Sequence, residues 1–213
     1  MKLFKMHPIK TLILSCLCLS LYRVFSQWDM VYLFLVFNLF LAWIPYHLSK
    51  KVHQTNNIYI QLGLVGLVIL FLPNASYLLT DFVHFRKGLK INLWYDLVLF
   101  FTYALTGLTL TLYTIDEILC FVSHRFKKNW LTQATYLLFP AIGVGIYLGR
   151  VERFNSWDVF LHPFQFSRDL MHLVTSNKLI HMIEFTLLFG LFTGIIYVLF
   201  GQIRNTKEVK SLS

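Results

Sequence analysis

Charged and uncharged positions divide the chain into long uncharged stretches separated by short polar ones. With histidine counted as neutral, five stretches are long enough to cross a bilayer: 30–49, 52–80, 97–115, 129–149 and 185–203. A helix needs about 20 apolar residues to cross the hydrocarbon region. Since only helices and closed barrels satisfy their backbone groups in lipid, these stretches predict membrane-spanning helices.

A sixth stretch, near the N-terminus, is shorter than the others. It lies between Lys10 and Arg23, whose long side chains can reach the membrane interface and extend the usable segment to residues 9–25. A secretory signal is the alternative interpretation, because three lysines precede the apolar residues. No small-residue cleavage site follows them, so we interpret the segment as an uncleaved first span.

The pattern predicts an all-α, polytopic membrane helix bundle, one integral membrane domain over residues 1–213. Six spans are expected, at residues 9–25, 30–47, 58–72, 96–115, 131–149 and 182–203. Polar connections are expected at 73–95 and 150–181. Pro73 interrupts the longest uncharged stretch and predicts a broken or re-entrant helix there. Alternating aromatic and charged residues in 150–181 are typical of a segment that lies in the membrane interface.

Composition and charge agree with a lipid environment. The chain is 57% hydrophobic and only 14% charged, against about 25% charged in soluble domains. Of its 19 Lys and Arg residues, 11 fall on the tails and the connections after the second and fourth spans, and 8 on the opposite side. The positive-inside rule therefore predicts a multi-pass cell-membrane protein with both termini cytoplasmic. The excess of basic residues is explained by orientation, and we expect no nucleic-acid partner.

One group of candidate site residues follows Pro73. If residues 73–85 are helical, four polar side chains share one face: Asn74, Tyr77, Asp81 and His84. Polar groups that face lipid without partners are costly. This face therefore forms either a hydrogen-bonded helix contact or a functional site.

A second group lies on the longest polar connection and at the start of the fourth span. Arg150 and Arg153 have side chains suited to phosphate or carboxylate, and Asn155 and Asp158 follow them. Asp96 begins the fourth span, where an acid also stabilises a helix N-terminus. We expect this group to converge with the first group near the outer end of the bundle.

Carboxylate and histidine pairs three residues apart are typical of some metal sites on helices. Three such pairs are present: Asp81 with His84, Asp169 with His172, and His181 with Glu184. No zinc-binding motif or cofactor-binding loop accompanies them. The sequence therefore leaves the metal and any other cofactor unknown.

Several segments together resemble a known family. They are residues 38–46, the Pro-Asn segment within 71–81, the Trp-Tyr-Asp at 94–96, and the Gly-Arg to Asn-Ser-Trp-Asp segment at 149–158. They are similar to a bacterial membrane-protein family catalogued as a domain of unknown function, number thirteen sixty-one. The resemblance implies a bacterial multi-pass membrane protein and no particular activity.

Three functional hypotheses are compatible with these residues. The first is an outward-facing site that binds or acts on an anionic or lipid-linked headgroup, in which Asp81, His84 and Asp158 serve as acid and base. The other polar residues named above would then bind the substrate. A small-solute or ion transporter and a non-catalytic assembly or scaffold protein are the alternatives. Enzyme activity and oligomeric state stay open at this point.

Overall fold

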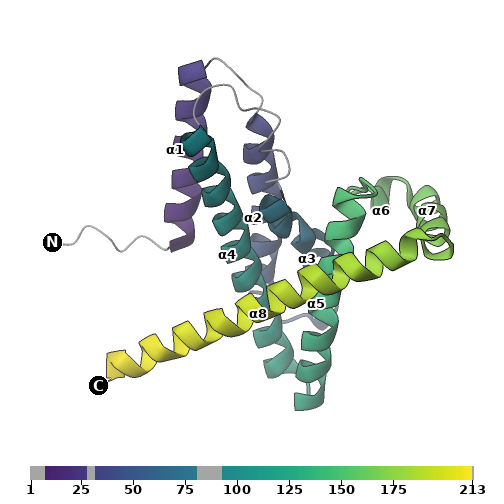
Figure 1. The fold of residues 1–213 in the computed structure, drawn as a ribbon. Coiled ribbons are helices and arrows are strands. Elements are labelled where there is room, and N and C mark those ends of the chain that lie inside the picture. The colour runs from purple at the N-terminus through teal and green to yellow at the C-terminus, as the bar shows by residue number, and fades with distance from the viewer. Residues whose placement is uncertain (1–7, 28–31, 81–92, 213) are drawn as a thin grey trace. The chain divides into compact units, whose positions relative to one another are not determined.

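The computed structural model describes residues 8–27, 32–80 and 93–212, and every regular element in this part of the chain is a helix. The helices are labelled as in Figure 1. Their bounds are α1 Pro8–Gln27, α2 Leu33–Val52, α3 Ile58–Thr80, α4 Leu93–Arg125, α5 Lys128–Arg150, α6 Asp158–Leu161, α7 Pro163–Thr175 and α8 Lys178–Leu212.

Six of these helices are long and apolar enough to cross a membrane. The segments that qualify are 8–26, 33–52, 58–80, 93–125, 129–150 and 178–202. They match the six predicted spans, so the predicted all-α architecture of a multi-pass membrane protein is confirmed. Two helices, α6 and α7, lie in the connection where the sequence predicted an interfacial segment.

The third span differs from its prediction. We expected a break at Pro73, whereas α3 continues through Pro73 to Thr80. Proline removes one helix hydrogen bond, and a long apolar helix tolerates this loss when neighbouring groups compensate for it. The turns after Pro73 are buried, including Asn74 and Ser76. Packing of these turns therefore explains why the helix does not end at Leu72.

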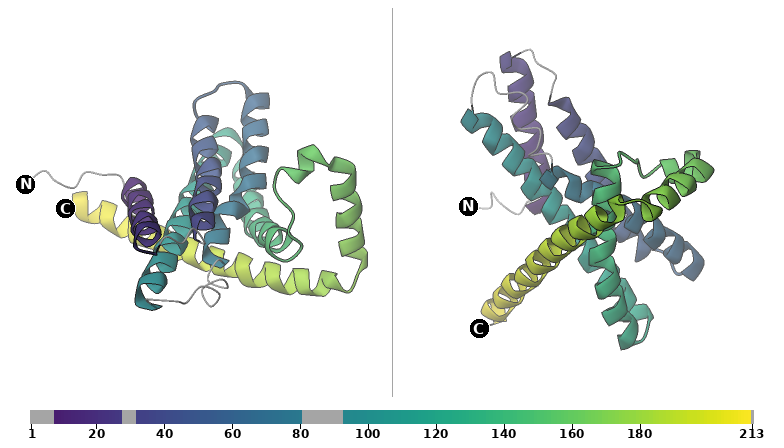
Figure 2. Two further views of the ribbon diagram at one scale, coloured as in Figure 1. Left: turned by 90° about the horizontal axis from the view of Figure 1, so that it is seen from above. Right: turned by 45° about the vertical axis from the view of Figure 1, so that its right-hand side comes forward.

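The chain forms two compact units, residues 1–118 and 119–213. In the first unit, α2 and α3 form an antiparallel hairpin, and α1 runs beside α4 (Figures 1 and 2). Its core includes Leu35 and Leu39 from α2 and Phe100 and Tyr103 from α4. The prediction of a single domain stays a prediction.

Gly107 marks the closest approach of α3 and α4. A Cβ atom at Gly107 would overlap the carbonyl oxygen of Ala75 and lie 2.8 Å from Cβ of Leu78. No side chain fits at this distance, so glycine is required for the two helices to pack as they do.

In the second unit, α5 packs against α8. A Cβ atom at Gly143 would lie 2.6 Å from the carbonyl oxygen of Thr186, so here too glycine permits close packing of the backbones. The short helices α6 and α7 connect the end of α5 to the start of α8 (Figure 2). Because α5 and α8 both qualify as spans, this connection is tied to the membrane surface at both ends.

Candidate functional site

Asp96, a predicted substrate-binding residue, forms a buried ion pair with Arg23. Nε of Arg23 donates a hydrogen bond of 2.8 Å to Oδ1 of Asp96, and Nη2 lies 3.4 Å from Oδ2. Arg23 is 5% exposed and Asp96 1% exposed. The pair joins the last turns of α1 to the first turn of α4 and gives Asp96 a role in helix packing, while its role in substrate binding stays a prediction.

Tyr32, the residue just before α2, contacts both members of this ion pair. Its hydroxyl donates to Oδ2 of Asp96 at 3.4 Å, and the guanidinium carbon of Arg23 lies 5.0 Å from the centre of its ring. Burial raises the pKa of the Tyr32 hydroxyl, and the negative charge of Asp96 raises it further. The hydroxyl therefore stays protonated and able to donate at neutral pH.

Arg23 was not among the residues predicted from the sequence to interact with Asp96. A signal was present, because Arg23 ends the first predicted span and Asp96 begins the fourth. In a six-span topology these two positions lie at the same face of the membrane. Opposite charges at the ends of two spans are expected to pair, because a lone charge near lipid is costly.

Other polar groups in the first unit form hydrogen bonds between helices. The Ser20 and Tyr103 hydroxyls are 2.7 Å apart, and Sγ of Cys16 is 3.2 Å from the Thr106 hydroxyl. Between α3 and α4, the Ser76 hydroxyl lies 3.3 Å from that of Thr111. Such contacts are typical of packed membrane helices.

The face predicted after Pro73 is described only in part. Asn74 is buried and Tyr77 half-buried on α3, and both interact with other groups. Asp81 and His84 lie outside the described residues. The expected convergence of this face with Arg150 and its neighbours concerns both units and stays a prediction.

Arg150 and Arg153 lie on either side of the end of α5. Arg150 is its last residue, while Arg153 is exposed and has a left-handed backbone conformation with φ of 62°. The turn is closed by the N–H of Phe154, which donates to the carbonyl of Leu148 at 3.0 Å. Glycine usually occupies such a position, so Arg153 is an unusual residue there.

Asn155 and Asp158 are brought together as neighbours. Oδ2 of Asp158 accepts hydrogen bonds from the Asn155 backbone N–H at 2.7 Å and from its side-chain amide at 3.3 Å. Asp158 begins α6 and is half-buried. The contact fixes the turn that leads from α5 into α6.

A small pocket lies beside this turn, between it and α7. It has a volume of about 160 Å³ and is lined by Phe154, Asp158, His162, Gln165, Phe166 and Asp169. Asp169 was predicted from the sequence only as one half of a possible metal pair with His172. Its position in the pocket was missed, because it depends on how α7 folds back on the turn.

A larger cleft of about 580 Å³ lies between the C-terminal end of α5 and the start of α8. Lys178 pairs there with Glu152 at 2.9 Å, and His181 lies 3.4 Å from Glu184 as their spacing predicted. Across the part of the chain that the structure describes, no three metal-ligating side chains converge.

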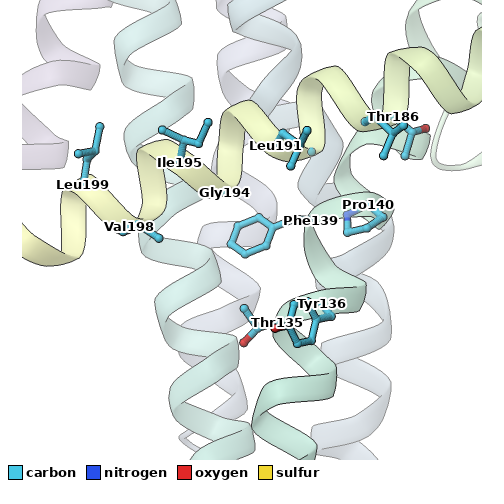
Figure 3. Close-up of a pocket in the computed structure, with 12 residues that line it drawn as sticks. Thr135, Tyr136, Phe139, Pro140, Thr186, Leu191, Gly194, Ile195, Val198 and Leu199 are labelled. Atoms are coloured by element: carbon cyan, nitrogen blue, oxygen red, sulfur yellow. The ribbon is translucent and has the colours of Figure 1, made fainter.

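A third cavity, of about 530 Å³, is an apolar groove between α5 and α8. Figure 3 shows the ring of Phe139 from α5 next to Gly194 and Leu191 of α8. The exposed side chains of this groove are aromatic or aliphatic along both helices, including Tyr136, Leu187 and Ile195. Its lining is suited to lipid chains or another helix, and it offers few groups for chemistry.

The architecture defines a multi-pass membrane protein with a structured connection between its last two spans. The family model described as "Protein of unknown function (DUF1361)" matches residues 37–193. The chain therefore belongs to this family, as its sequence segments indicated. The searches of curated proteins and of solved structures found no match.

Proposed function

We propose that the connection between α5 and α8 binds the anionic headgroup of a lipid or lipid-linked molecule, with Arg153 as the main contact to the anion. The observation that carries this proposal is the exposed guanidinium of Arg153 on a left-handed backbone at the end of a span. A side chain in this conformation costs about 1–2 kcal/mol. Such outliers are concentrated at binding and catalytic sites.

The surroundings of Arg153 support a location at the membrane surface. Phe160, Phe164 and Met171 on α6 and α7 are all exposed. Phe164 and Met171 are seven residues apart, so they share one face of α7. Exposed aromatic and aliphatic residues beside charged ones are typical of helices that lie among lipid headgroups. A headgroup bound by Arg153 would therefore belong to a lipid whose chains contact the same helices.

Binding is a better supported function than catalysis or transport. Asp158 is the one proposed catalytic residue in the described part of the chain, and its carboxylate is held by Asn155. A transporter needs polar groups that face a path through the membrane. The polar pairs described within the first unit, such as Ser20 with Tyr103, contact each other instead.

The test is a calorimetric titration that measures the affinity of dihexanoyl phosphatidylglycerol for the full-length protein in maltoside micelles. Arg153→Gly keeps the turn and removes the guanidinium, and we expect it to weaken binding about tenfold, as for loss of a charge-assisted hydrogen bond. Arg168→Ala removes another exposed arginine of the same connection and is the matched control. Equal affinity of Arg153→Gly and the unmodified protein would contradict the proposal.

A further inference from the structure

The pocket between the 154–158 turn and α7 is lined by negatively charged side chains. Two carboxylates line it, from Asp158 on α6 and Asp169 on α7, and both residues are half-buried. None of its lining residues is a lysine or an arginine. Asn155 occupies Oδ2 of Asp158, so Oδ1 is the oxygen that can accept from a ligand. The pocket therefore attracts a cation.

Aromatic rings form another part of the pocket. The rings of Phe154 and Phe166 pack edge to face with their centres 5.4 Å apart. The faces of aromatic rings attract ammonium groups, and combinations of rings and carboxylates recognise organic cations. Two aromatic rings therefore line the same pocket as the two carboxylates, and this combination favours an organic cation over a bare metal ion.

The size of the pocket restricts the cation further. A volume of 160 Å³ corresponds to about five water molecules at about 30 Å³ each. Pockets for drug-sized ligands have volumes of roughly 300–1,000 Å³. The pocket is therefore suited to a small ammonium group with one or two attached carbons.

The backbone of Arg153 lies at the edge of the pocket, because the next residue in the chain, Phe154, is one of its lining residues. An anion at Arg153 and an ammonium group in the pocket would then belong to a single zwitterionic headgroup. The opposite face of α7, with Phe164 and Met171, is exposed and apolar. This arrangement places lipid chains and headgroup on the two sides of one short helix.

We propose that this pocket binds the primary ammonium group of a phosphoethanolamine-type headgroup, with Asp158 and Asp169 as its charge partners. This inference rests on the proposed function, in which Arg153 binds the phosphate of the same headgroup. It adds a preference for zwitterionic over purely anionic headgroups. The same chemistry is found in a membrane lipid and in a soluble phosphoethanolamine, and the lipid is the source that the exposed face of α7 favours.

The experiment compares two short-chain lipids on the full-length protein in maltoside micelles. Dihexanoyl phosphatidylethanolamine should bind more tightly than dihexanoyl phosphatidylglycerol. Asp169→Asn should weaken binding of the ethanolamine lipid about tenfold and leave the glycerol lipid unchanged. Glu184→Gln neutralises an exposed carboxylate on α8, outside the pocket, and should change neither affinity. Phe166→Leu keeps an apolar side chain and tests the ring if Asp169→Asn does not fold.

The outcomes separate this inference from the function on which it rests. Arg153→Gly should weaken binding of both lipids, and unchanged binding of both would contradict the proposed function. If the unmodified protein binds the two lipids with equal affinity, or if Asp169→Asn lowers the affinity for both equally, the proposed ammonium pocket is wrong. The proposed anion site would not be affected by either result. Soluble phosphoethanolamine should compete weakly. If it competes as well as the lipid, the ammonium pocket is supported and the source of the ligand is soluble.

Discussion

Arg23 in α1 and Asp96 in α4 form a buried ion pair, with 2.8 Å between Nε and Oδ1. The pair joins the first span to the fourth, and the hydroxyl of Tyr32 adds a third group to it. It explains why a short apolar segment interrupted by an arginine is part of the helix bundle.

Removing one partner of this pair should strongly destabilise the protein. Asp96→Asn leaves the buried guanidinium of Arg23 without its counter-charge, and we expect a loss of about 3–5 kcal/mol in the free energy of unfolding. The double variant Arg23→Met with Asp96→Leu should recover much of this loss, because no unpaired charge is then buried. Chemical unfolding in micelles measures the free energy of unfolding of each variant. Additive effects of the substitutions at Arg23 and Asp96 would contradict the proposed pairing energy.

The exposed pair between Glu152 and Lys178 should behave differently from the buried one. Lys178 is 56% exposed at its side chain, although its Nζ lies 2.9 Å from Oε2 of Glu152. Exposed ion pairs contribute about 0–1 kcal/mol. Lys178→Gln should therefore shift the unfolding free energy by less than about 1 kcal/mol. A loss as large as that of Asp96→Asn would show that this pair holds the ends of α5 and α8 together.

Gly107 should not tolerate a side chain. Gly107→Ala places Cβ against the backbone of Ala75 and the side chain of Leu78, so α3 and α4 must separate. We expect a loss of about 1–3 kcal/mol, typical of overpacking. Gly66→Ala in α3 meets no atom within 4 Å and is the matched control. Thermal unfolding should therefore show a lower midpoint temperature for Gly107→Ala than for Gly66→Ala.

Arg153→Gly should stabilise the fold while it weakens headgroup binding. The left-handed conformation costs an arginine about 1–2 kcal/mol, and glycine adds about 0.5–1 kcal/mol of chain entropy to the unfolded state. We therefore expect a net gain of about 0.5–1 kcal/mol in unfolding free energy. Opposite changes in stability and affinity are a signature of a residue retained for binding. Loss of both would indicate that the guanidinium has a structural role instead.

The predicted orientation is tested in whole cells by labelling single cysteines, introduced after the three native cysteines have been replaced by serine. With both termini cytoplasmic, Asn177→Cys in the connection before α8 should react with a membrane-impermeant maleimide added from outside. Gln54→Cys, between α2 and α3, should react only after lysis. The reverse labelling pattern would show that the orientation predicted from the count of 11 basic residues against 8 is wrong.

The spans could be predicted from sequence because uncharged length is a strong physical requirement of the bilayer. Pro73 misled the prediction, because the burial of α3 beyond it depends on packing that the sequence alone does not reveal. Arg23 was missed as the partner of Asp96 because the predicted topology places both at one membrane face but does not show which spans pack together. Arg153 was named for its charge, but its left-handed backbone has no sequence signal, since glycine is the residue expected there. The pocket at Asp169 depends on how α7 folds against the preceding turn.

Headgroup binding at the connection between α5 and α8 is tested by photo-cross-linking in a lipid bilayer. The full-length protein would be reconstituted in nanodiscs with a phosphatidylethanolamine that carries a photoreactive headgroup, and the labelled peptides would be identified by mass spectrometry. We expect the lipid to attach within residues 151–177, and we expect clearly less attachment in the Arg153→Gly variant. Equal labelling of residues 53–57, or labelling of 151–177 that Arg153→Gly leaves unchanged, would contradict it.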